Sequence, residues 1–287
     1  MDRNVKEVQN IGLEILKEFI RICDIHNLRY FLGYGSAIGT VRHQGFIPWD
    51  DDIDVFMPRE DYELFCEICK KELDSKFFLQ NYKTEPACSL IWGKLRKNNT
   101  LLVENYNSDL KFHFGVWIDI FILDKVSDNH FIRLINKCSL FILKNLYIVK
   151  CNVQLPPNRL SFINKLCYNI TKVFVKPLSK NFLINNIDKL LKKYQHKNTK
   201  FVMDYSFFKG LLIECNQLNT YKVMPFEDIN VRMFDDYDKI LKQYYGDYMR
   251  IPTEEERKNG SGHYVNDFKT FIETDNPEGY IVYNENK

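Results

Sequence analysis

Four carboxylates fall within five residues, at Asp50, Asp51, Asp52 and Asp54, just before the apolar pair at 55–56. Alternate side chains of a strand share one face, so Asp52 and Asp54 are predicted to point the same way. Like charges held side by side repel each other, and a divalent cation between them relieves that repulsion. The pattern therefore predicts a Mg²⁺ site for phosphoryl chemistry, with Mn²⁺ as the alternative ion and Asp50 as a further ligand.

Other proteins also use closely spaced carboxylates. A calcium loop of the EF-hand type needs Gly at its sixth position and Glu at its twelfth, where this chain has Val55 and Asp61. That class is excluded. A solvated acidic loop is disfavoured by the apolar strand that follows. Glycosyltransferases that hold a nucleotide-sugar through a metal also place D-x-D at a strand end, and this alternative stays open.

Length and composition bound the class of protein. A chain of 287 residues can bury one large core or two modest ones. Eight cysteines and an N-terminus that starts directly with a helical apolar pattern (5–22) predict reduced thiols and a cytoplasmic location. The apolar run at 139–149 is interrupted by Lys144 and is too short to span a bilayer.

The charge is distributed unevenly along the chain. Residues 130–200 contain 14 Lys and Arg but one acid, Asp188, and their apolar residues recur at helical spacing. We therefore predict a basic helical insert at 126–200 that associates peripherally with the anionic inner leaflet of the membrane. A nucleic-acid patch and a helical cap with solvent-facing lysines are the rival interpretations; we expect no nucleic-acid partner.

The remaining segments predict an α+β fold, with a mixed sheet core, flanking helices and the basic insert. Residues 1–125 would form the catalytic core, and 201–287 a mixed region that completes it. Asp119 lies in a nearly continuous apolar strand, where an ionised carboxylate is costly unless it is paired or metal-bound. Strands are expected at 29–32, 53–57, 77–81, 89–96, 101–104 and 115–123, and helices at 37–42, 61–73 and 235–245.

A turn at Gly35 and Ser36, followed by Asp52, Asp54 and a later strand residue Asp119, matches the pattern of the nucleotidyltransferase fold. The string at 30–54, YFLGYGSAIGTVRHQGFIPWDDDID, closely resembles the LicD family, which is related to fukutin and fukutin-related protein. The resemblance covers roughly 5–125 and 205–265. Further matching positions are Lys94, Thr100, 115–121, 225–227, 245–249, Pro252 and His263.

The resemblance implies transfer of a phospho-alcohol from a CDP-activated donor to a sugar hydroxyl, with release of CMP. Phosphocholine is the first choice of group, although fukutin-like members use CDP-ribitol. The implied acceptor is a cell-surface glycan or lipid-linked oligosaccharide, such as teichoic acid, capsule or lipopolysaccharide. A nucleotide-sugar glycosyltransferase and an inert membrane-associated scaffold remain as alternatives.

The same resemblance implies roles for single residues. Asp52 and Asp54 would hold the metal, and Asp119 would be a third ligand or the base that takes the acceptor proton. Gly35 and Ser36 would offer N–H groups and a hydroxyl to a phosphate. Arg42 and Lys94 are candidates for gripping phosphate oxygens, with a salt bridge to one of the Asp residues as the alternative for each. Two lesser candidates are His43 as a general base and Glu227, for which no role can be derived.

Overall fold

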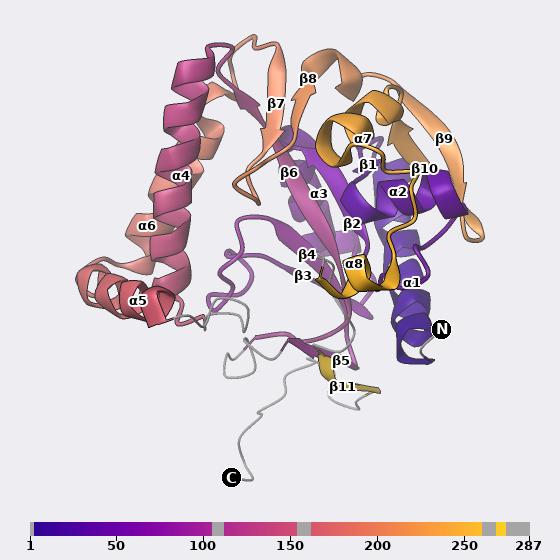
Figure 1. Ribbon diagram of the computed structural model, residues 1–287, viewed down its shortest axis with the longest axis horizontal. Coiled ribbons are helices and arrows are strands. Elements are labelled where there is room, and N and C mark those ends of the chain that lie inside the picture. The colour runs from indigo at the N-terminus through magenta and orange to yellow at the C-terminus, as the bar shows by residue number, and fades with distance from the viewer. Residues whose placement is uncertain (1–2, 105–111, 154–161, 260–267, 274–287) are drawn as a thin grey trace.

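The computed structural model describes residues 3–104, 112–153, 162–259 and 268–273 (Figure 1). A seven-stranded mixed sheet forms the centre, in the order β1-β2-β6-β4-β3, with β7 pairing β6 and β8 pairing β7. None of the described helices has the length and apolar content that a bilayer-spanning helix needs.

The strands of this sheet are β1 (Phe31–Leu32), β2 (Asp54–Pro58), β3 (Phe77–Gln80), β4 (Gly93–Lys97), β6 (Trp117–Val126), β7 (Phe201–Asp204) and β8 (Leu212–Glu214). Two separate pairs are β9 (Tyr221–Phe226) with β10 (Ile229–Phe234), and β5 (Thr100–Glu104) with β11 (Phe268–Glu273). The helices are α1 (Arg3–Ile25), α2 (Tyr34–His43), α3 (Arg59–Glu72), α4 (His130–Lys150), α5 (Phe162–Val175), α6 (Lys180–Leu191), α7 (Tyr237–Tyr245) and α8 (Glu254–Asn259), with short 3₁₀ turns η2 (Lys192–Tyr194) and η3 (Cys215–Leu218).

The central strand, β6, organises the sheet. It pairs in parallel with β2 on one side. On its other side, its first half pairs antiparallel with β4 and its second half antiparallel with β7. Nearly every β6 residue is buried, which explains the apolar run in the sequence. One charged residue of this strand, Asp124, is paired with Arg59 of α3 at 2.7 Å.

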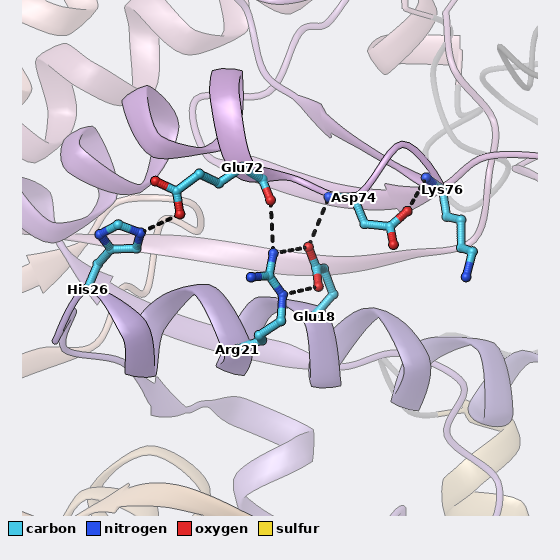
Figure 2. A network of polar contacts seen from close by, with 6 residues as sticks. All are labelled: Glu18, Arg21, His26, Glu72, Asp74 and Lys76. Carbon is cyan, nitrogen blue, oxygen red and sulfur yellow. Dashed lines mark hydrogen bonds and ion pairs between the residues drawn. The ribbon is translucent and has the colours of Figure 1, made fainter.

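Helices α1 and α3 pack together beside the sheet. Buried apolar residues recur at helical spacing along α1, and the ring of Phe19 lies 5.1 Å from that of Phe65 in α3. A polar network closes the end of this contact (Figure 2): Arg21 binds the Glu18 carboxylate and donates to the carbonyl of Glu72, whose carboxylate meets His26. This region therefore forms a rigid support behind β2, β4 and β6.

The insert leaves the sheet after β6 and returns at β7. Its helices α4, α5 and α6 share a small apolar core, and α4 stands to one side of the sheet (Figure 1). The predicted boundaries of 126 and 200 coincide with these strand ends, whereas the predicted break at Pro156 and Pro157 lies outside the described residues. The division into three units stays a prediction.

The α+β class with a mixed sheet is confirmed. Three local predictions need correction. The alternation argument treated Asp52 and Asp54 as residues of one strand, but β2 begins at Asp54, so Asp52 precedes it. The turn expected at Gly35 and Ser36 is helical: α2 begins at Tyr34, which has a positive φ of 39°. The strand expected from residue 89 starts only at Gly93.

Candidate active site

A cavity of about 860 Å³ opens at the ends of β2 and β6 where these strands begin. Parts of the chain that are far apart in sequence line it: α2 with the acidic loop, the strands β4 and β6, helix α4, and the segment 244–257. Asp50, Asp52, Asp54 and Asp119 all contribute to the wall, as do Gly35, Arg42 and Lys94. The structure thus brings the predicted site residues to one cavity, except Ser36 and the lesser candidates His43 and Glu227.

Four polar residues form a row across the sheet. In the strand register, Asp54 of β2 is opposite Asp119 of β6, Asp119 is opposite Lys94 of β4, and Lys94 is opposite Gln80 of β3. The backbone N–H of Asp119 also donates to the carbonyl of Ile53, at 2.8 Å. Because register partners present their side chains to the same face, the sheet itself fixes this row in the cavity floor.

The carboxylate of Asp119 is held by nitrogen donors from three side chains. Trp92 donates from Nε1 to Oδ1 at 2.6 Å, and Trp117 donates from Nε1 to Oδ2 at 2.9 Å. The ammonium of Lys94 lies 3.4 Å from Oδ2 and 3.8 Å from the ring centroid of Trp117. The salt bridge that was the alternative for Lys94 is therefore present. Each carboxylate oxygen has two lone pairs, so Asp119 retains capacity for a ligand.

The acidic loop concentrates negative charge in the cavity. Burial raises the pKa of Asp54 well above its ordinary value, and repulsion from Asp52, Asp119 and Asp50 adds to the effect. Burial, then Asp52, likewise raises the pKa of Asp50. The phenol of Tyr245 has its pKa raised by burial and by the nearby Asp54. Burial and crowding of these carboxyl groups thus raise the pKa values at this part of the cavity wall.

The donors have the chemistry that Mg²⁺ prefers, since carboxylate oxygens are hard ligands. The mutual repulsion of Asp50, Asp52 and Asp54 is the energy that a bound cation would relieve. In the described part of the chain, no three His, Cys, Asp or Glu side chains already converge as a ligand set. The acids fit the ion by type and charge, and the metal site stays a prediction.

Ser36 positions Asp54, the last acid of the run, and does not face the cavity. The hydroxyl of Ser36 accepts a hydrogen bond from the backbone N–H of Asp54 at 2.8 Å, and it is buried outside the cavity lining. This geometry gives no support to Ser36 as a phosphate ligand. Gly35 does line the cavity, and a Cβ there would lie 2.7 Å from Oδ2 of Asp50. Glycine therefore allows the acidic loop to approach α2.

Glu227 acquires a structural role. Its carboxylate accepts a hydrogen bond from the N–H of Phe46 at 3.1 Å, and its own N–H donates to the carbonyl of Gln44 at 2.8 Å. A Cβ at Gly45 would collide with this carboxylate. Glu227 thus fixes the loop that leads into the acidic run. His263 lies outside the described residues.

Arg42 lies in the last turn of α2 and lines the cavity. Its Nη1 donates to the carbonyls of Tyr248 and Arg250, and its Nε donates to Nε2 of His43 at 3.0 Å. Among the residues described, no carboxylate forms a salt bridge with Arg42, so that alternative is wrong for this residue. His43 is not part of the lining, and burial and the Arg42 charge lower its pKa.

The sequence interpretation missed several wall residues. Trp117 could have been predicted, because it lies two positions before Asp119 on a predicted strand and so shares its face. Trp92 lies two positions before Lys94 but precedes the observed strand. Arg257 and Tyr245 come from the C-terminal segment, whose place against the cavity depends on tertiary packing.

Comparison with known proteins agrees with the resemblance seen in the sequence. Residues 27–158 match the family described as LicD/FKTN/FKRP, nucleotidyltransferase domain. The chain is 28% identical to the lipopolysaccharide cholinephosphotransferase LicD of Haemophilus influenzae, over 88% of this chain and 94% of that protein. Shorter matches are to uncharacterised proteins of Rickettsia prowazekii (29% identical, 41% of its length) and Rickettsia typhi (36% identical, 24% of its length).

Proposed function

Because residues 27–158 match the LicD/FKTN/FKRP nucleotidyltransferase-domain family, we propose that this protein transfers phosphocholine from CDP-choline to a sugar hydroxyl of a cell-surface glycan. The observation that carries the proposal is the row of Asp54, Asp119 and Lys94 in the cavity floor. The Haemophilus relative supports choline as the alcohol and lipopolysaccharide as the acceptor. The mixed sheet with acids on neighbouring strands supports a nucleotidyltransferase-like core.

In the proposed reaction, the acceptor hydroxyl oxygen bonds to the phosphorus that carries choline. The P–O bond to the neighbouring phosphate breaks, and CMP leaves with the bonding electrons. Asp119 takes the hydroxyl proton, since its orientation is fixed by Trp92 and Trp117. Lys94 remains beside that carboxylate and compensates negative charge on the donor.

Asp52 and Asp54, with Asp50 as a further ligand, are the residues proposed to hold Mg²⁺. When bound, the ion supplies charge neutralisation at the donor phosphates. Burial and repulsion from the neighbouring acids raise the pKa of Asp54, and a bound cation would relieve that repulsion. The acidic loop therefore makes sense in this function as a cation holder.

We further propose that the insert places the enzyme on an anionic membrane surface, where a lipid-linked acceptor would be found. The outer strip of α4 supports this: five large apolar side chains recur at spacings of three, four, seven and eight residues and are exposed, Phe131 to 76%. Such a stripe normally faces a core. The members of this outer strip are Phe131, Leu134, Ile135, Phe141 and Ile142.

The strip is continuous with the cavity mouth and has basic neighbours. The ring of Phe141 lies 5.0 Å from that of Phe208, and Phe207 lines the cavity. On α5, Val173 and Phe174 are more than two-thirds exposed beside lysines at 172 and 176. Apolar side chains flanked by lysines are the composition that anionic bilayers attract.

Basic side chains of α4 bind backbone carbonyls, and the solvent-facing lysine cap stays an alternative for the rest of the insert. Arg133 donates to the carbonyl of Ser127, Lys137 to that of Lys209, and Lys144 to that of Ser206. These cations turn towards the β7–β8 side and leave the apolar side chains outside. Burial of the lysine stems thus leaves α4 with an apolar outer face.

The decisive experiment is a donor panel. Protein with Mg²⁺ and a lipopolysaccharide or teichoic acid acceptor is incubated with CDP-choline, CDP-ribitol, UDP-sugars and GDP-sugars, and the released nucleotide is identified. We expect CMP from CDP-choline and a choline-modified glycan. Release of UDP or GDP instead would establish the glycosyltransferase alternative. Absence of turnover with every donor would favour the inert scaffold.

A further inference from the structure

Two guanidinium groups meet at one end of the cavity around the ring of Trp49. Arg42 comes from the last turn of α2 and Arg257 from α8, more than two hundred residues later. The Cζ atom of Arg257 lies 3.7 Å from the Trp49 ring centroid, and that of Arg42 lies 5.9 Å from it. Both arginines and Trp49 line the cavity that holds the acidic row.

Neither arginine forms a salt bridge with a carboxylate of the described residues. Their neighbour Arg250 shows the contrast, because Glu256 binds it through two hydrogen bonds of 2.9 Å. Burial, and next the positive charge of Arg257, lower the pKa of Arg42, whereas the charge of Asp50 acts in the opposite direction.

The hydrogen bonds that these arginines make orient them and leave donors available. Arg42 donates from Nε to His43 and from Nη1 to two backbone carbonyls. Arg257 donates from Nε to the carbonyl of Pro252 at 3.0 Å. Nη2 of Arg42 and both Nη atoms of Arg257 make no hydrogen bond to a described residue. Guanidinium N–H groups that are available in this way can donate to phosphate oxygens.

We infer that Arg42 and Arg257, braced by Trp49, form a seat for a diphosphate, and that its occupant is the diphosphate of the nucleotide-linked donor. The choice of donor over acceptor phosphate rests on the proposed function; the anion site itself does not. A diphosphate carries enough negative charge to offset both guanidinium groups. A diphosphate bound by both side chains would link helix α8 to helix α2.

The test measures binding rather than turnover. Inorganic pyrophosphate is titrated into the full chain by calorimetry in EDTA, so that no divalent cation contributes to affinity. We expect binding that weakens roughly tenfold or more in Arg257→Gln, and less in Arg257→Lys, which keeps the charge. Lys239→Gln removes a surface charge at a residue that does not line the cavity and is the matched control. Circular dichroism and the melting temperature establish that each variant is folded.

Three results would overturn the inference: no pyrophosphate binding by the unaltered chain, equal binding by the Arg257→Gln variant, or an equal loss in the Lys239→Gln control. A competition arm tests the occupant. CDP-choline should displace pyrophosphate, whereas glycerol phosphate should not; the reverse order would refute the donor assignment. Failure of CMP release together with intact, Arg257-dependent pyrophosphate binding would count against the proposed function and leave the anion seat standing.

Discussion

Asp54 and Asp119 are partners in the register of the two parallel strands β2 and β6. This relationship places two carboxylates side by side on a sheet that cannot slide without exposing buried residues of both strands. Their repulsion costs folding free energy, and a cation bound between them would offset that cost. The following outcomes depend on this arrangement and on its surroundings.

Replacing Asp54 with Asn should abolish activity and leave the fold at least as stable. The amide is of similar size but removes a charge that Asp52, Asp119 and Asp50 repel. CMP release should fall by roughly a thousandfold, and the melting temperature should stay level or rise. The exposed Asp228→Asn is the control and should change neither value. Near-normal turnover by the Asp54 variant would contradict the site.

Metal removal provides a separate prediction for the unaltered enzyme. Treatment with EDTA should stop CMP release, and added Mg²⁺ should restore it, because the acidic loop then regains a counter-charge. Mn²⁺ should substitute at least in part. The measurement is the rate of CMP release against free metal concentration. Full activity after exhaustive chelation would remove the metal from the mechanism.

Trp92→Phe should lower kcat while leaving KM nearly unchanged. The substitution keeps an aromatic ring in the cavity wall but removes the N–H that donates to Oδ1 of Asp119 at 2.6 Å. Loss of this orienting bond should cost about tenfold in kcat. Tyr82→Phe removes a comparable donor to Asp188, on the insert, and should have no such effect. Equal kcat values for Trp92→Phe and wild type would show that the indole does not position Asp119.

Stability should fall as the pH drops below about 6.5, in part because of His113. This buried ring accepts from Gly115 N–H at Nδ1 and meets Oδ1 of Asn98 through Nε2, so it is held as the neutral form. Burial lowers its pKa to about 3. The unfolded chain therefore binds a proton near pH 6.5 that the folded chain refuses until near pH 3. The stability contribution is complete above pH 6.5 and is lost as the pH falls through this window.

In urea unfolding, the His113→Gln variant should lack this component, which is on the order of 3 kcal/mol between pH 7 and pH 4. The comparison is the difference between the two pH profiles, since acids titrate in both proteins. Parallel profiles for the variant and the unaltered chain would show that His113 accepts its proton without cost.

A serine substitution of Phe131, Ile135 and Ile142 together should weaken binding to vesicles that contain an anionic lipid. These side chains are 59–76% exposed, and each would bury apolar area in the bilayer. Co-sedimentation should drop at least tenfold, and binding by the unaltered chain should weaken as salt increases. The control is Leu64→Ser with Val223→Ser, exposed apolar residues on other elements. Concentration-dependent dimers without vesicle binding would assign the strip to a second copy of the chain.

Local patterns predicted the parts of the site that depend on strands and their periodicity. The burial of the Asp119 strand and the clustering of acids before residue 55 follow from alternation and from the cost of a lone charge. Alternation did not predict that Asp52 lies outside β2, because the ends of a strand depend on its pairing partners. Periodicity predicted helices in the insert but not which side of α4 meets the protein. The approach of Arg257 to Trp49 depends on chain packing over long distances in sequence, which no local pattern records.

Val126 and Phe201 are register partners on β6 and β7, so the whole basic insert departs from and rejoins the sheet at one place. Substitution or lengthening of residues 127–200 would leave the spacing of the Asp54 and Asp119 carboxylates untouched. At the same time it would rebuild the wall that Lys144 and Ile148 contribute to the cavity. Chimeras that exchange this segment between relatives should thus change the preferred glycan while keeping the same nucleotide chemistry.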